Sequence, residues 1–425
     1  MRPLYERLVR VPEGDRGGTT GDVAANGLRQ IAAQALQSTG DQVVNAKTVL
    51  PWLFSALGVP AGLVGLLVPI RESGSMLPQA ALVPRVRRQP VRKWLWVTGS
   101  AGQALATAAM AVTAATASGT AAGVAILVAL AVFSLSRALN SLASKDVLGR
   151  TVPKGQRGQI TGLATLLSGG VAITVGVGIR LLGGNDSGPL VWLLVAAALA
   201  WVAAIAVYAG IREPAGEVAP PVDGGPGWVR KSVDLLRADA PFRRFVFVRT
   251  LLLVSALSPP FVVALAAGHG GGLSGLGAFV IASGLASLVG GRLFGRWADR
   301  SSRRVLIWGA AVASAVIAGF LALHAVPEVR EWTLLYPVVY LLLALTHTAV
   351  RVARKTYVVD MAAGDRRTAY VAVANTAMGL LLLVAGGLSS LLALLSAEAA
   401  LVFLALLGAA GVVTARTLPE VSTGI

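Results

Sequence analysis

A run of polar side chains follows helical spacing inside a long apolar stretch near the N-terminus. The run consists of Gln34, Gln37, Asp41, Asn45 and Thr48. Steps of three and four residues place such side chains on one face of a helix. A polar face on an otherwise apolar, membrane-spanning helix is expected to line a water-filled cavity. The open alternative is an amphipathic segment in the cytoplasm, followed by a membrane span that begins near residue 44.

Asp41 is the acidic residue of this face, and Arg137 is its predicted basic partner. Asp41 lies roughly 16 Å into a span that begins at residue 30, and Arg137 lies roughly 9 Å from the inner end of a span over 119–143. Charges inside a membrane are costly and are usually paired. An arginine favours the ionised carboxylate, whereas desolvation favours the neutral acid. We therefore predict that Asp41 takes up and releases a proton, with its charge balanced by Arg137.

Two further arginines and a glutamate lie within apolar stretches. Arg71 and Glu72 are adjacent, so they point about 100° apart on a helix. One is expected to face the cavity while the other pairs with a neighbouring span, and a salt bridge that only fixes packing is an equally open reading. Arg249 precedes Pro259 and Pro260, which should kink or unwind their helix. Broken helices near the membrane midplane often form substrate sites.

The stretch over 332–353 carries Tyr340 and His347 about two helical turns apart. They are predicted to line the cavity from the second half of the chain, with a packed helix interface as the alternative. The full set of predicted substrate contacts is Gln37, Asn45, Arg71, Glu72, Arg249, Tyr340 and His347. Because three of the intramembrane residues are arginines, we expect an anionic substrate or one that carries a carboxylate.

The composition indicates that these side chains lie in a membrane protein. Hydrophobic residues make up 55% of the 425 positions and charged residues only 13%, against about 25% charged residues in soluble domains. There is no cysteine, and the three histidines are too scattered for a convincing metal cluster. No nucleotide-binding Gly-x-x-x-x-Gly-Lys-Ser/Thr motif is present. We therefore expect no enzyme activity, no metal and no cofactor.

Apolar stretches of about 20 residues, the length that crosses a bilayer, divide the chain. The twelve predicted spans are 30–56, 61–84, 94–117, 119–143, 158–182, 189–211, 243–266, 272–295, 305–326, 332–353, 369–393 and 396–417. The predicted organisation is a flexible cytoplasmic tail over 1–28, six-helix bundles over 29–211 and 243–417, a cytoplasmic linker over 212–242 and a C-terminal tail over 418–425. The fold class is therefore an all-α membrane protein with two related bundles.

Basic residues gather in every second loop between these spans. The chain has 37 Lys and Arg against 20 Asp and Glu, yet the loops predicted to lie outside hold only Arg330. This alternation follows the positive-inside rule, and it places both termini in the cytoplasm and the protein in the cytoplasmic membrane. The net charge of +17 therefore reflects membrane topology and not a nucleic-acid partner.

The loop after the eighth span carries a specific pattern over 291–304. Its sequence is Gly-Arg-Leu-Phe-Gly-Arg-Trp-Ala-Asp-Arg-Ser-Ser-Arg-Arg, which resembles the loop signature of the major facilitator superfamily. The resemblance implies a twelve-helix transporter in which this loop latches one half against the other on the cytoplasmic side. The residues that would carry the latch here are Gly295, Asp299, Arg300 and Arg303. The matching loop of the first half, 84–93, has no acidic residue and departs from the signature.

Span four adds a weaker match. Arg137-Ala-Leu-Asn140-Ser141 is similar to an Arg-x-x-Gln-Gly motif of that family, in which the arginine is linked to proton coupling. The sequence thus predicts a monomeric secondary transporter of a small organic solute, working by alternating access, with protons and membrane lipid as its other partners. The alternative is a receptor or assembly factor on the same scaffold. The degenerate first-half loop favours that alternative, whereas the intramembrane charges oppose it.

Overall fold

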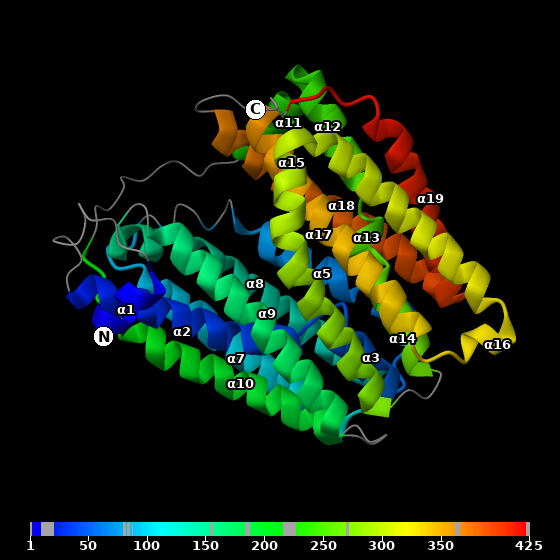
Figure 1. The fold of residues 1–425 in the computed structure, drawn as a ribbon, viewed down its shortest axis with the longest axis horizontal. Helices are drawn as coiled ribbons and strands as arrows, with labels where there is room; N and C mark the ends of the chain where they lie inside the picture. Colours follow the sequence, from blue (N-terminus) through cyan, green and yellow to red (C-terminus); the bar gives the residue numbers. More distant parts are fainter. Residues whose placement is uncertain are drawn as a thin grey trace.

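The computed structural model describes most of the chain as helices joined by short turns (Figure 1). The described residues are 2–9, 21–79, 82, 86, 88–153, 156–182, 188–215, 227–268, 272–361 and 366–421. Over these ranges the regular structure is helical, and no strand is present.

The first bundle contains long tilted helices that run side by side at the lower left of Figure 1. Its elements are α1 (Arg2–Leu8), α2 (Gly21–Val43), α3 (Val49–Ala56), α4 (Ala61–Val64), α5 (Leu67–Met76), α7 (Lys93–Thr116), α8 (Gly119–Thr151), α9 (Arg157–Leu182) and α10 (Gly188–Ala209). Helix α2 packs along α9 and α10, and α7 packs along α8 and α10.

The second bundle occupies the right of the same view. Its elements are α11 (Gly227–Ala238), α12 (Ala240–Leu251), α13 (Val254–Leu257), α14 (Pro259–Gly268), α15 (Gly272–His324), α16 (Pro327–Arg330), α17 (Leu335–Met361), α18 (Arg366–Ala393) and α19 (Ala397–Ala415). Ser301 leaves helical geometry inside α15 (φ −161°, ψ 96°), so this element forms two rods that meet at an angle.

When broken helices are joined and the helices α1, α11 and α16 are left out, the described residues form twelve rods, six in each bundle. The pairs α2–α3 and α4–α5 and the trio α12–α13–α14 each make one rod, and α15 makes two. Seven helical segments of the described chain are long and apolar enough to cross a membrane. The predicted fold class, an all-α membrane protein of two six-helix bundles, is confirmed.

Two rods break where the sequence interrupts its own helical hydrogen bonding. Between α2 and α3 the Asn45 side chain accepts a hydrogen bond from the backbone N–H of Lys47 (2.9 Å), a local bond that competes with helix formation. The seventh rod turns after Leu251 and bends again at Ser258, before Pro259. The predicted break of this span is present, and both breaks lie beside the central cavity described below.

The N-terminal residues differ from the expected flexible tail. Residues 2–8 form α1, and α2 begins at Gly21, nine residues before the predicted span. Tyr5 is fully buried, and its hydroxyl donates to the Gln156 side chain (2.7 Å). Burial raises the pKa of Tyr5 to about 12, so it remains a neutral donor. The ring packs over Gly27, where a Cβ atom would lie 2.4 Å from it; this packing holds α1 against the bundle.

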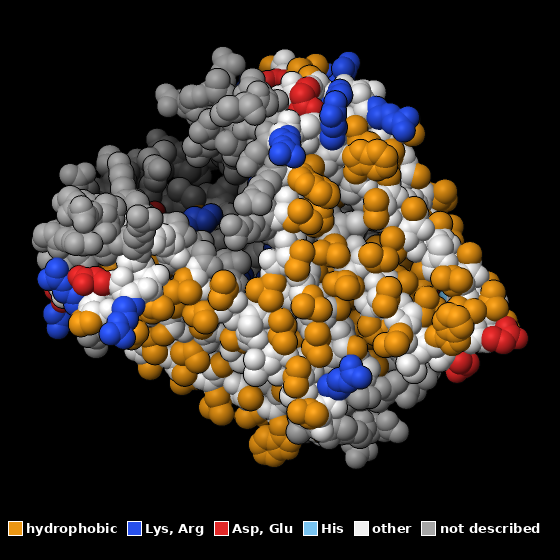
Figure 2. Space-filling view, viewed as in Figure 1, with side chains coloured by type: hydrophobic (Ala, Val, Ile, Leu, Met, Phe, Trp, Pro, Cys, Tyr) orange, Lys and Arg blue, Asp and Glu red, His pale blue; other side chains and the backbone are white. Residues whose placement is uncertain are grey.

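Hydrophobic side chains cover the flanks of both bundles, and Lys and Arg lie toward their ends (Figure 2). The exposed apolar residues include Leu105, Trp192, Leu199, Leu391 and Leu406. A belt of this kind requires lipid around it, because water would leave the large apolar surface unsatisfied. The protein is therefore a multi-pass membrane protein.

The bundles touch along two seams lined by small residues. In the first seam, between α5 and α18, Ser73 donates to the carbonyl of Gly379 (2.6 Å). In the second, between α9 and α15, a Cβ atom on Gly176 would lie 2.8 Å from the backbone nitrogen of Ile281 and 3.0 Å from the carbonyl oxygen of Gly277. Backbones approach this closely only where side chains are small. The bundles diverge from these seams toward the end where both termini lie (Figure 1).

Replacement of Gly176 by alanine should lower stability, because the new methyl group meets backbone atoms that cannot rotate away. We expect a loss of roughly 1–3 kcal/mol, measured as a lower melting temperature of the detergent-purified protein. Gly178→Ala on the same helix is the control, since a Cβ atom there has no neighbour within 4 Å. Equal melting temperatures for the two variants would show that the α9–α15 seam is not closely packed.

Candidate functional site

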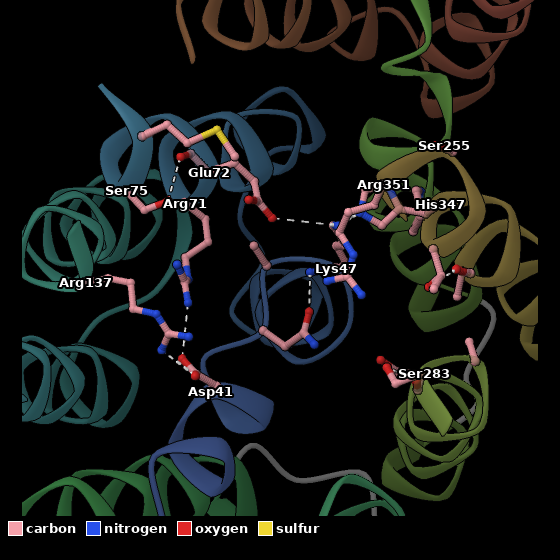
Figure 3. A pocket seen from close by; sticks show the side chains of 18 of the residues that line it. Asp41, Lys47, Arg71, Glu72, Ser75, Arg137, Ser255, Ser283, His347 and Arg351 are labelled. Atoms are coloured by element: carbon pink, nitrogen blue, oxygen red, sulfur yellow. Dashed lines mark hydrogen bonds and ion pairs between the residues drawn. The ribbon is translucent and has the colours of Figure 1, made fainter. Parts of the chain in front are cut away.

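A cavity of about 770 Å³ lies between the two bundles (Figure 3). Its walls come from α2, α5 and α8 of the first bundle and from α12 to α15, α17 and α18 of the second. The space-filling view shows the molecule hollowed between the bundles (Figure 2). Because both bundles line this cavity, a change in their relative position would change access to it.

Asp41 lies on the first-bundle wall between two guanidinium groups. It accepts a hydrogen bond from Arg71 of α5 (3.2 Å) and a short one from Arg137 of α8. The Arg71 guanidinium also lies over the ring of Phe133, 4.9 Å from its centroid, a favourable cation–π arrangement. The Gln37 amide faces Arg137, with hydrogen bonds of 2.6 and 3.3 Å when its oxygen is oriented toward the guanidinium. One carboxylate thus joins three helices.

Lys47 occupies the turn between α2 and α3 and has partners in both bundles. Its ammonium group lies 3.8 Å from the Glu72 carboxylate and 3.0 Å from Nε2 of His347 on α17. The first contact stays within the first bundle, and the second joins the two bundles. Figure 3 shows Lys47 between Glu72 and His347. Glu72 and Arg71 are adjacent on α5, yet each finds its own partner, and both line the cavity.

The second-bundle wall is basic, and its arginines have fewer hydrogen-bond and ion-pair partners among the described residues than those of the first wall. Arg249 is buried, and its guanidinium donates to the Asn375 side chain (3.1 Å). Arg354 of α17 is also buried, and no ion pair or hydrogen bond joins it to another described residue. Tyr340 packs edge-on against the ring of Phe279, with 5.5 Å between the centroids. All the named residues except Phe279 line the cavity.

The cavity is strongly positive. Among its described lining residues, eight are Lys or Arg and two are acidic. The basic residues are Lys47, Arg71, Arg137, Lys145, Arg249, Arg351, Arg354 and Lys355. The acidic residues are Asp41 and Glu72, and both are already paired with cations. A focused positive field of this kind raises the local concentration of anions.

The sequence-predicted contacts converge on this space. Asp41, Arg137, Asn45, Arg71, Glu72, Arg249, Tyr340 and His347 line the cavity, and Gln37 lies behind Arg137. The residues of the span-four motif lie on two sides of α8. Arg137 faces the cavity, whereas Asn140 is buried and donates to Ser100 and Gln103 of α7. The functional roles of all these sequence-predicted residues are predictions.

The predicted gating loop lies at the bend of α15. The surroundings of Gly295 and of the Asp299 side chain lie outside the described part of the structure. Arg300 is exposed. Arg303 donates to the carbonyl of Leu418 (3.0 Å) and lies 3.8 Å from the Glu420 carboxylate, so its described contacts stay within the second bundle.

Lys47 was not predicted because it departs from helical periodicity. It lies two residues after Asn45 and would point away from the polar face of a continuous helix. The break after Val43 brings it into the cavity. The signal available in the sequence was the cluster of polar residues from Asp41 to Thr48, which weakens the helix.

Arg354 was missed for a different reason. The predicted tenth span ended at residue 353, which assigned Arg354 and Lys355 to a basic inner loop. Helix α17 continues to Met361 and carries these residues along the cavity. Positive residues near a span end therefore serve the cavity as well as topology.

Comparison with known proteins defines the fold. No family model matches the sequence, and no curated protein matches it. A mutant of the nucleoside transporter NupG aligns over 92% of this chain and 99% of its own, with a TM-score of 0.72 and 10% identity. A D-xylose–proton symporter aligns over 94% and 99% with a TM-score of 0.68 and 10% identity. A POT family transporter in complex with a thioalcohol-conjugated peptide aligns over 96% and 97% with a TM-score of 0.71 and 9% identity.

The chain has the fold of the major facilitator transporters. This confirms the architecture that the loop over 291–304 implied, although the structural match concerns the arrangement of helices and not the sequence of that loop. The charged cavity lies between the two halves of this fold. Among the described residues no group of acidic or histidine side chains is arranged to hold a metal ion.

The Lys47–Glu72 pair gives a test of the site geometry. Lys47→Glu should lower the melting temperature, because it places two carboxylates together and removes the ammonium group that lies 3.8 Å from the Glu72 carboxylate. The double variant Lys47→Glu/Glu72→Lys should recover most of that loss by reversing the pair. Lys145→Glu is the control, since Lys145 is exposed and has no ion pair among the described residues. Additive losses in the double variant would contradict the pairing.

Proposed function

We propose that this protein is a secondary transporter that moves a small organic anion across the cytoplasmic membrane by alternating access. The observation that carries this proposal is the positive cavity shared by the two bundles. A scaffold protein gains nothing from eight basic residues around a central space, because each costs desolvation energy. An anionic solute offsets that cost while it is bound.

The geometry of the seams supports alternating access. The bundles touch along the α5–α18 and α9–α15 seams and diverge toward the termini. With both termini in the cytoplasm, as the loop charges predict, the cavity opens inward. Rocking of one bundle against the other about these seams would close that end and open the opposite one. The bundle limits of 29–211 and 243–417, and the monomeric state, are part of the same proposal.

We also propose that proton uptake at Asp41 drives the cycle. Asp41 shares its charge between Arg71 and Arg137, so protonation would release both guanidinium groups at once. Their freed positive charge can then attract the anionic substrate or alter the contacts between helices. One neighbour of the same fold is described as a proton symporter, which makes proton coupling compatible with this architecture.

The alternative function is binding without transport, as in a receptor. Substrate counterflow in proteoliposomes separates the two, because only a carrier exchanges labelled solute against an unlabelled pool. Organic anions with carboxylate or phosphate groups are the solutes to screen first, by thermal stabilisation of the purified protein.

Asp41→Asn is expected to abolish accumulation of substrate driven by a pH gradient, because asparagine cannot exchange a proton. Exchange by counterflow should persist, since that reaction needs no net proton movement. Both are measured as uptake of the labelled solute by proteoliposomes containing the full-length protein.

Asp146→Asn is the matched control for this experiment. It also removes a carboxylate paired with an arginine, Arg92 (2.8 Å), but that pair lies outside the cavity lining. Accumulation should be retained in this variant. Undiminished pH-driven accumulation in Asp41→Asn would remove Asp41 from the coupling mechanism.

A further inference from the structure

Two buried arginines stand on the second-bundle wall without an acidic partner. Arg249 of α12 is 6% exposed and Arg354 of α17 is 9% exposed. The described structure shows no carboxylate within 4 Å of either guanidinium. Each has a buried Nε–H group with no hydrogen-bond acceptor among the described residues. Two unsatisfied donors from two helices therefore border one cavity.

The charges of Arg249 and Arg354 act on each other, and they repel. The charge of Glu72 acts on Arg354, but the Glu72 carboxylate lies within 4 Å of Lys47 instead. On the first-bundle wall Asp41 pairs with Arg71 and Arg137, whereas no acidic residue among those described lines the second wall. An uncompensated pair of buried cations is costly, so something other than the described side chains must offset it during function.

Neutral polar groups beside this pair also lack partners. The Ser255 hydroxyl and the Nδ1 atom of His347 are buried and unpaired in the described structure, and both residues line the cavity. Figure 3 places Ser255 and His347 on the same side of the cavity. These groups can bind a polar body that continues from the anionic end of a ligand.

We infer that Arg249 and Arg354 form the binding site for a dianionic end of the substrate, either one doubly charged oxyanion or two carboxylates. The inference rests on the proposed transport function and specifies its substrate class. Two guanidinium groups balance two negative charges, and their planar forks suit oxyanions through paired hydrogen bonds. A singly charged ligand would leave one of the buried cations uncompensated.

The binding test uses the full-length protein in detergent and chloride buffer at about pH 8, where a phosphate group is doubly charged. Melting temperature is recorded against sodium phosphate, sulfate, succinate and acetate at matched ionic strength. We expect stabilisation by dianions and none by acetate. Stabilisation by phosphate and sulfate indicates one compact dianionic group, whereas stabilisation by succinate alone indicates two separated carboxylates. Equal effects of acetate and succinate, or no effect of any dianion, would overturn the inference.

Arg354→Gln should weaken dianion binding by about ten- to a hundredfold, the effect of losing one charge-assisted hydrogen-bonding group. The same variant should melt at a higher temperature without ligand, because it removes a repelling buried charge. A purely structural arginine would give the opposite sign. Arg244→Gln is the control, since Arg244 is exposed on α12, the helix that carries Arg249, and lies outside the cavity lining; its dianion binding should remain near the parent value.

Counterflow separates this inference from the proposed function. Dianion binding that depends on Arg354 but gives no counterflow would support the site and contradict transport. Counterflow of a monoanion or a neutral solute that is unaffected by Arg354→Gln would support transport and overturn the site.

Discussion

The cost of placing charge away from water is the constraint on which this structure depends. On the first-bundle wall the Asp41 carboxylate lowers this cost by forming ion pairs with both Arg71 and Arg137. Removing one member of such a buried group typically costs about 3–5 kcal/mol, because it leaves uncompensated charge. Since the three residues come from α2, α5 and α8, their pairing fixes the relative positions of three helices as well as the charge of the wall. The positions of these three helices and the charge of the Asp41 carboxylate are therefore coupled.

The broken helices follow from the same constraint. A continuous helix from α2 into α3 would turn Lys47 away from the polar face, so the pairing with Glu72 would be lost. The Asn45 side chain offers the backbone a local hydrogen bond at this point, and the break brings one more cation into the cavity. Irregular backbone within a membrane is tolerated where it borders a polar cavity. Local chemistry at 44–48 thus determines which charges meet across the centre of the molecule.

The sequence predicted the fold and the first-bundle pair because both rest on long-range patterns. Span lengths and alternating loop charges are physical requirements of a bilayer, and Asp41 and Arg137 stand out as charges within apolar stretches. Lys47 and Arg354 could not be found in that way. The first depends on a helix break whose position is fixed by one side-chain hydrogen bond, and the second on α17 continuing eight residues beyond the apolar run. Tyr5 was missed because its partners, Gly27 and Gln156, are distant in sequence. A local hydrogen bond determines the first of these features, and tertiary packing determines the other two.

The two walls of the cavity differ in a way that bears on how the bundles move. On the first wall two carboxylates, Asp41 and Glu72, pair with three of the four basic residues. The second keeps Arg249 and Arg354 uncompensated, so its energy depends on what occupies the cavity. The bundles are joined by glycine-lined seams and also by large apolar side chains, such as Trp52 of the first bundle against Phe279 of the second. Among the described residues, the polar contacts between the halves include Lys47 with His347 and Ser73 with Gly379. A ligand that binds this wall more tightly in one arrangement of the bundles than in the other would shift the balance between the two arrangements by that difference in affinity.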